Sequence, residues 1–196
     1  MPEVFVEQMT ATVEVWYEPT DIHKAAKPFQ KEGYKFISYL SPNLKELQVI
    51  RSHFNIPERL PSALPSLHSD GTIPHRGGDR DFYHHLFSFL PGLRLLLVKM
   101  GKSGSFVVQR AGSDCRNGSP SHQNLTFKAH LAPNVPDEAV VNVSGSGDCM
   151  AAGVIHGLIN GWQDIDRSIS LGTFAASCSL RSRQTVPAAI TSAALN

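Results

Sequence analysis

The clearest potential for chemistry lies in residues 142–153, which read Asn-Val-Ser-Gly-Ser-Gly-Asp-Cys-Met-Ala-Ala-Gly. Gly145 and Gly147 allow a tight backbone turn immediately before a helix, with N–H groups exposed. The first turn of a helix leaves about four N–H groups without an intrahelical acceptor, at the positive end of the helix dipole. The spacing therefore predicts an anion site formed by Gly145, Ser146 and Gly147, suited to a phosphoryl group that gains charge.

Asp148 follows this turn, and its position allows two roles. The carboxylate can complement the helix dipole or cap the helix. It can instead point into the anion site and act as the base for an incoming hydroxyl. The spacing alone leaves both roles open. The small residues that follow, Ala151, Ala152 and Gly153, are expected to let this helix pack close to a sheet.

Two other glycine patterns do not match the motifs that they suggest. Gly101-Lys-Ser has the tail of a P-loop, but Leu96 occupies the place of its first glycine. Gly145-x-Gly could open a dinucleotide fingerprint, but Met150 occupies the place of the third glycine. Neither a P-loop nor a dinucleotide-binding motif is predicted.

Alternating strand-like and helix-like segments must position the anion site. Runs of β-branched and apolar residues predict strands over residues 12–18, 36–40, 93–99, 104–110, 125–131 and 140–143. Apolar residues at helical spacing predict helices over residues 21–33, from 43 to about 50, from 148 to about 160, and over 164–181. Irregular segments are expected at residues 57–81 and 111–124. This succession predicts an α/β fold: an open, doubly wound, largely parallel sheet with helices on both faces.

Composition excludes several classes of protein. The 196 residues include 18 Lys and Arg against 17 Asp and Glu, a formal net charge of +1, which argues against nucleic-acid and membrane-surface partners. Cys115, Cys149 and Cys178 are far apart and odd in number, as expected in a reducing compartment. Glu3 and Glu7, without a basic flank, do not fit a signal peptide. We therefore expect a cytoplasmic protein.

Four motifs, which follow one another along the chain in the order usual for that family, resemble those of the PfkB (ribokinase-like) carbohydrate kinases. Residues 143–153 resemble the C-terminal family signature, whose usual core is Thr-Gly-Ala-Gly-Asp. Residues 16–19 resemble the strand end that commonly reads Asp-Pro, residues 41–46 the Asn-x-x-Glu motif, and residues 97–104 the hairpin that lines the nucleotide. The resemblance covers roughly residues 12–190. Within the family, Val-Trp-Tyr-Glu-Pro-Thr and Val-Asn-Val-Ser-Gly look most like pseudouridine kinases, some of which are fused to a pseudouridine-5′-phosphate glycosidase.

The resemblance assigns roles to individual residues. Asp148 matches the catalytic base, and the turn 145–147 matches the anion hole. Asn43 and Glu46 match the pair that organises Mg²⁺, which keeps much of its hydration shell and would be held through water. From the residues alone, Asn43 is an N-cap and Glu46 closes a capping box, and both roles can hold together.

Further residues match the nucleotide site of the family. Gly101 and Gly104 match the turn that lines the nucleotide, and Lys99 is a candidate phosphate contact, although an exposed lysine is ordinarily solvated. Asn142 stands where many relatives have Asp, at a position tied to the monovalent-cation site, which argues against potassium activation. ATP and Mg²⁺ are the cofactors that the resemblance implies.

Family members run to roughly 300 residues, so residues 12–196 resemble the C-terminal part of their domain, without the N-terminal half and its lid; residues 1–11 match nothing. The implied function is ATP-dependent phosphorylation of a sugar or nucleoside hydroxyl, with pseudouridine as the expected acceptor of the full-length parent. By itself, the chain is expected to bind Mg·ATP without useful turnover. The alternative is a non-catalytic nucleotide-binding fragment or an unstable truncated isoform. A homodimer and a fused or associated glycosidase domain are the partners that remain open.

Overall fold

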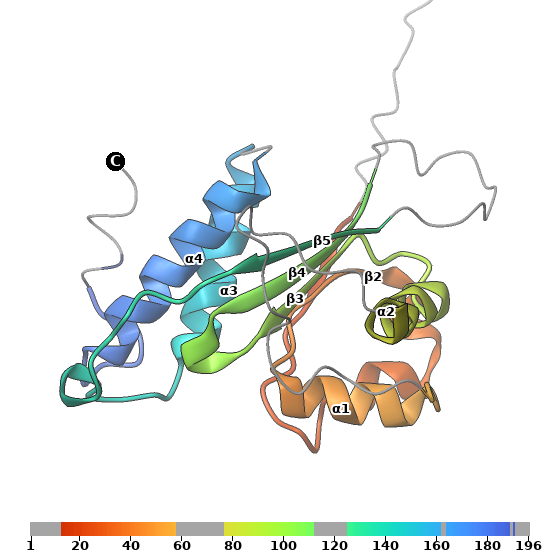
Figure 1. Cartoon of the computed structure of the whole chain (residues 1–196), viewed down its shortest axis with the longest axis horizontal. Helices are drawn as coiled ribbons and strands as arrows, with labels where there is room; N and C mark the ends of the chain where they lie inside the picture. Colours follow the sequence, from red (N-terminus) through yellow and green to blue (C-terminus); the bar gives the residue numbers. More distant parts are fainter. Residues whose placement is uncertain (1–12, 58–76, 112–124, 162–163, 189, 191–196) are drawn as a thin grey trace, which may run out of the picture.

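A single mixed sheet forms the centre of the computed structural model, which describes residues 13–57, 77–111, 125–161, 164–188 and 190. The sheet order follows the chain, and the first three strands are parallel whereas the last two pair antiparallel (Figure 1). The strands are β1 (Val15–Tyr17), β2 (Ile37–Leu40), β3 (Leu95–Lys99), β4 (Ser105–Arg110) and β5 (Leu125–His130).

Helices cover both faces of this sheet, α1 and α2 on one side and α3 and α4 on the other (Figure 1). The α-helices are α1 (Leu44–His53), α2 (Gly77–Phe89), α3 (Ser146–Ile159) and α4 (Ile165–Leu180). Short 3₁₀ helices are η1 (Lys27–Gln30), η2 (Glu32–Phe36), η3 (Gly101–Ser103) and η4 (Asp137–Ala139). The predicted α/β sheet with two helical layers is confirmed.

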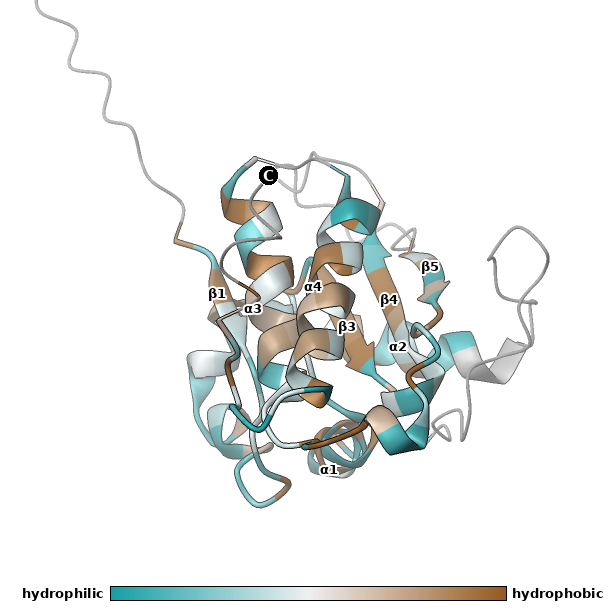
Figure 2. Cartoon of the chain, turned by 90° about the vertical axis from the view of Figure 1, so that its left-hand side faces the viewer, coloured by the Kyte–Doolittle hydropathy of each residue, from teal (hydrophilic) through white to brown (hydrophobic). Residues whose placement is uncertain are grey.

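Strand β3 is buried on both faces, as its unbroken apolar run predicts. Leu96 and Val98 belong to the core under α1 and α2, whereas Leu95 and Leu97 belong to the core under α3 and α4. Figure 2 shows this apolar strand behind α3 and α4. The central strand therefore links the two cores, and its last residues stand at the edge where the parallel strands end.

The contact face of α3 differs from the prediction. Val154 packs into the core against β3, but Ala152 is exposed. Gly153 faces Gly172 of α4 rather than the sheet, because a Cβ atom on it would lie 2.7 Å from Gly172 Cα. Gly153 thus serves helix–helix packing.

The helix predicted over residues 21–33 does not form as an α-helix; turns followed by η1 and η2 replace it. Pro28 at the start of η1 lacks an N–H donor, which interrupts α-helical hydrogen bonding. The carbonyl groups of Lys24 and Ala25 accept the Tyr17 hydroxyl instead. Ala25 and Phe29 nevertheless enter the core, whereas Ile22 is 42% exposed.

The strand predicted over residues 140–143 is also wrong. Both the Val141 and the Asn142 N–H groups donate to the Leu180 carbonyl, at 2.8 Å and 3.2 Å, so they join no strand in the described part of the chain. Val141 is 52% exposed and Val143 is 70% exposed. The C-terminal end of α4, not a neighbouring strand, therefore positions residues 141 and 142, which lead into the predicted anion site at residues 145–147, hereafter the anion turn.

Some predictions fall largely outside the described residues. These are the N-terminal segment 1–11, most of the irregular segment 57–81, whose end forms the start of α2, and nearly all of 111–124. Among the helices that the structure describes, none is both long and apolar enough to cross a bilayer.

Candidate active site

The carboxyl ends of β1, β2 and β3 lie side by side and hold the first group of site residues. Ser41 N donates to the Tyr17 carbonyl at 3.1 Å, and Lys99 N donates to the Pro42 carbonyl at 2.8 Å. Asn43 and Lys99 form an isolated parallel bridge just past β2. In sheets with parallel strands, ligands commonly bind outside the carboxyl ends. Side chains that follow these strands therefore share one edge of the sheet.

The anion turn is built around Gly145, which has a left-handed backbone with φ of 79° and serves as the N-cap of α3. A Cβ atom at this position would overlap the Thr185 methyl group, so the turn requires glycine here. Cys149 N donates to the Gly145 carbonyl at 2.9 Å and closes the first helical turn. The N-cap residue makes no side-chain capping hydrogen bond. This helix start can therefore offer backbone N–H groups to an anion.

Lys99 from β3 reaches this helix start. A Cβ atom on Gly147 would lie 3.3 Å from Lys99 Nζ, so the ammonium group lies against the turn. Lys99 also forms an ion pair with Glu18, and the two side chains are only 12% and 18% exposed. The sequence predicted Lys99 as a phosphate contact; the structure brings it beside Gly147 of the predicted anion hole.

Glu18 was missed as a functional candidate by sequence reasoning. Its second carboxylate oxygen accepts the Ser41 hydroxyl, and Ser41 Oγ accepts Trp16 Nε1–H at 2.7 Å. Burial raises the pKa of Glu18, the Lys99 ammonium opposes that rise, and the Asp148 carboxylate adds to it. The position of Glu18 at a strand end was the available signal, but its partner Lys99 is 81 residues away in the chain.

Asp148 is exposed in the first turn of α3, near Glu18 and Lys99. Gly145, not Asp148, occupies the N-cap position, so the capping role considered for Asp148 is not the one it takes. A carboxylate in the first turn still complements the helix dipole. Its exposure also leaves it accessible to an incoming hydroxyl, and its role as a base stays a prediction.

Asn43 and Glu46 form the complete capping box that their spacing predicts. Glu46 N donates to Asn43 Oδ1 at 3.0 Å, and Asn43 N donates to Glu46 Oε2 at 2.8 Å. Their oxygen donors suit Mg²⁺, but each side chain already accepts a backbone N–H, so the pair fits a hydrated ion held through water. Within the described residues, no group of three or more His, Cys, Asp or Glu side chains could hold a metal. The Mg²⁺ role stays a prediction.

Gly101 begins η3 and Gly104 follows it, and the two have positive φ angles of 59° and 99°. Met100 N donates to the Gly104 carbonyl at 2.9 Å, which closes the turn between β3 and β4. A Cβ atom on Gly104 would overlap the His130 carbonyl oxygen and lie 2.6 Å from Ala132 N. The turn predicted to line a nucleotide therefore packs against the segment that follows β5.

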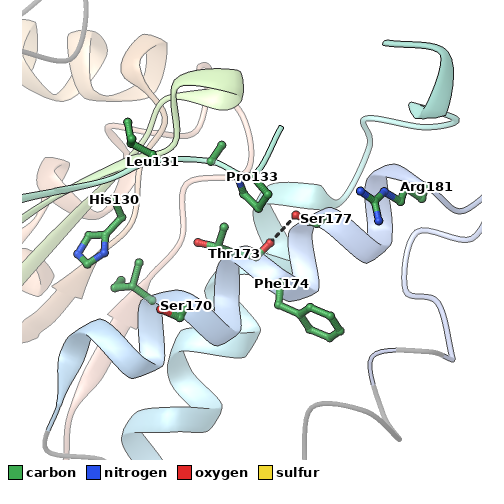
Figure 3. A pocket seen from close by; sticks show the side chains of 10 residues that line it. His130, Leu131, Pro133, Ser170, Thr173, Phe174, Ser177 and Arg181 are labelled. Carbon is green, nitrogen blue, oxygen red and sulfur yellow. Dashed lines mark hydrogen bonds between the residues drawn. The ribbon is translucent and has the colours of Figure 1, made fainter. Parts of the chain in front are cut away.

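A cavity of about 510 Å³ lies between that segment and α4. Figure 3 shows its lining side chains, which combine apolar groups with small hydroxyl groups. They are His130, Leu131, Ala132, Pro133, Ile169, Ser170, Thr173, Phe174, Ser177 and Arg181. Sequence reasoning missed this cavity, although small polar residues at helical spacing on one side of α4 were the available signal.

Residues 6–191 match the family model described as pfkB family carbohydrate kinase. Solved structures share the fold: ribokinase from Thermotoga maritima is 18% identical with a TM-score of 0.54. Adenosine kinase from Schistosoma mansoni in complex with 2-fluoroadenosine is 13% identical with a TM-score of 0.59. Ribokinase from Arabidopsis thaliana, complexed with ribose and ATP, is 18% identical with a TM-score of 0.53.

These alignments cover 83%, 87% and 80% of this chain, but 44%, 43% and 39% of the three solved chains. The chain thus spans less than half the length of these relatives. At such low identity, the likeness establishes a ribokinase-like fold and nothing finer. Among curated protein sequences, none matches the chain.

Proposed function

Because this chain belongs to the pfkB family of carbohydrate kinases, we propose that it carries the phosphoryl-transfer half of an ATP-dependent sugar or nucleoside kinase site. The observation that supports this role is that Lys99, at the carboxyl edge of the sheet, lies against the anion turn at the start of α3. Asp148 stands in the same helical turn. An anion site, a cation and an accessible carboxylate are groups that stabilise charge and orient the nucleophile in phosphoryl transfer.

The proposed mechanism assigns charge stabilisation to the turn and proton removal to Asp148. The N–H groups of the α3 start and the Lys99 ammonium would stabilise negative charge on the transferring phosphoryl group. Asp148 would accept the proton of the attacking hydroxyl late in the displacement, because a carboxylate is too weak a base to ionise an alcohol beforehand. Mg²⁺, when bound, supplies further neutralisation of the phosphate charge.

The cavity beside α4 is the proposed site of the nucleotide base. Its wall contacts Gly104, in the turn that follows Lys99, and Lys99 lies against the α3 start, where the phosphates would lie. Leu131, Pro133 and Phe174 offer apolar surface, and Thr173 supplies a hydroxyl group, a combination that suits a heteroaromatic base.

The acceptor is proposed to be a sugar or nucleoside, with pseudouridine as the specific candidate. This choice rests on the resemblance of the strings around Trp16 and Val143 to pseudouridine kinases. Because the chain spans less than half of its solved relatives, a nucleotide-binding piece without catalysis is the second candidate.

Two measurements test the proposal. Mg·ATP should stabilise the purified chain, by about 2.7 kcal/mol at a hundredfold excess over Kd; no shift of the melting transition would contradict a nucleotide site. Labelled-phosphate transfer from ATP should then be screened against ribose, fructose, adenosine and pseudouridine. We expect binding without transfer by this chain, and transfer to pseudouridine by a kinase of full family length that carries these residues. Transfer to another acceptor alone would overturn the pseudouridine assignment.

A further inference from the structure

The Lys99 ammonium belongs to a hydrogen-bonded chain that crosses three strand ends. Trp16 Nε1–H donates to Ser41 Oγ at 2.7 Å, the Ser41 hydroxyl donates to Glu18, and Lys99 donates to the other Glu18 oxygen. Ser41 is fully buried, and Glu18 and Lys99 are largely shielded from water. Each Glu18 oxygen therefore has a donor, and the carboxylate is held from two sides.

The same chain leaves Lys99 with donors to spare. An ammonium group carries three N–H donors, and within the described residues Glu18 accepts one of them. The group lies against Gly147, where even a methyl side chain would stand 3.3 Å from Nζ. Lys99 can thus keep its bond to Glu18 while it donates to an anion at the α3 start.

We propose that Glu18, held by Ser41 and Trp16, is a positioning residue that keeps the Lys99 ammonium at the phosphoryl site. This inference rests on the proposed function and adds a residue to it that neither the sequence motifs nor the family match assigned. A lysine side chain is flexible and strongly hydrated, and it loses rotamer freedom when it binds. The bond to the fixed carboxylate already orders the Lys99 side chain before a phosphate binds, so that little rotamer entropy of Lys99 is lost on binding.

The structure contains a matched control for this arrangement. Glu14 accepts Arg94 on one carboxylate oxygen and the Tyr39 hydroxyl on the other, as Glu18 accepts Lys99 and Ser41. Glu14 precedes β1 and Arg94 precedes β3, so this pair lies at the amino ends of the two strands, whereas Glu18 and Lys99 lie at their carboxyl ends, beside the anion turn. Substitutions of Tyr39 and Glu14 therefore remove a similar set of bonds, between more exposed side chains, at a place where no phosphate is proposed to bind.

The test measures Mg·ATP affinity by calorimetry in four variants of the 196-residue chain: Ser41→Ala, Lys99→Met, their combination, and the control Tyr39→Phe. Ser41→Ala removes no charged group; it removes one hydroxyl that holds Glu18 and that also lowers the pKa of that carboxyl. We expect it to raise Kd about fivefold to tenfold, as for a hydrogen bond worth about 1 kcal/mol. In the Lys99→Met background, the same substitution should change Kd no further, because its route to the ligand is gone. Tyr39→Phe should leave Kd unchanged.

A second readout follows Lys99 itself, as its acylation rate by an amine-reactive reagent, located by mass spectrometry. Ser41→Ala and Glu18→Gln should both accelerate acylation of Lys99 several-fold, whereas Glu14→Gln should not. Unchanged acylation in both variants overturns the inference, whether or not nucleotide binds. If Ser41→Ala does not fold, Glu18→Gln takes its place in the acylation measurement and in the Lys99→Met combination.

The two proposals fail differently. If the wild-type chain does not bind Mg·ATP, the proposed function is contradicted and the phosphate role of Lys99 fails with it. If it binds but Ser41→Ala leaves Kd unchanged, or raises it equally in the Lys99→Met background, only the positioning role of Glu18 is overturned.

Discussion

Gly153 of α3 lies directly against Gly172 of α4, with room for no side chain on either residue. A Cβ atom on Gly153 would lie 2.7 Å from Gly172 Cα, and one on Gly172 would lie 2.5 Å from the Met150 carbonyl oxygen. The pair lets the backbones of the two helices approach closely. α3 begins at the anion turn, and α4 forms one wall of the cavity. The contact between the two glycines therefore holds the anion turn and the cavity together.

Gly153→Ala should destabilise the protein by about 1–3 kcal/mol, because the added methyl group overpacks a backbone contact that cannot yield. The free energy of unfolding in urea measures this loss. Gly33→Ala is the matched control, since its new Cβ atom would meet only the Pro28 carbonyl oxygen at an ordinary 3.9 Å. Equal stability of the two variants would contradict the close contact.

Arg110→Met should also destabilise the protein, by about 2 kcal/mol. The guanidinium donates to the carbonyl groups of Leu93 at 2.6 Å and Phe87 at 2.9 Å, and thereby joins the end of β4 to the end of α2. Its loss leaves these acceptors without a charged donor. Arg94→Met removes an exposed ion pair with Glu14 and should cost at most about 1 kcal/mol. A larger loss for Arg94 than for Arg110 would refute this ranking.

His130 should make stability depend on pH. Burial lowers the pKa of His130 below its ordinary 6.5, while Asp166 opposes the shift. The unfolded chain then binds the proton more readily, so the free energy of unfolding should rise as pH increases through the window between the lowered pKa and 6.5. In His130→Gln, this contribution to the slope should disappear.

Urea unfolding at about pH 5 and about pH 7 checks this prediction, as the difference between wild type and His130→Gln. Substitution of the exposed His23 by Gln reports the effect of removing a histidine elsewhere on the described surface. If wild type and His130→Gln keep the same pH dependence, the lowered pKa is wrong.

Asp148→Asn should lower kcat about 10²-fold or more in an active kinase that contains this chain, because an amide cannot accept the hydroxyl proton. The melting temperature and the Kd for Mg·ATP should stay close to those of the wild type. Asp164→Asn is the matched control, since Asp164 caps the neighbouring helix α4, where asparagine serves equally well. A loss of only a few-fold for Asp148→Asn would exclude its role as the base.

The elements that the sequence predicted well have local causes. Asn43 and Glu46 are three residues apart, so their capping box forms within one helical turn and can be recognised from spacing. The apolar run of β3 needs only burial on both faces, whichever helices provide it. The two errors in secondary structure have different causes: Pro28 interrupts helical hydrogen bonding in the segment 21–33, and the Leu180 carbonyl accepts the N–H groups of the predicted strand at Val141.

The sequence by itself determined the family and the α/β fold, and it predicted the anion turn, because these depend on residue types at short, regular spacing. The sequence offered Lys99 only as a candidate phosphate contact, and the tertiary structure alone placed its ammonium group against the predicted turn. Glu18 and Lys99 are 81 residues apart, and only the parallel pairing of β1, β2 and β3 brings them together with Ser41. The contact of Gly147 with Lys99 could not be predicted from the sequence either, because a glycine does not indicate which residue lies against it.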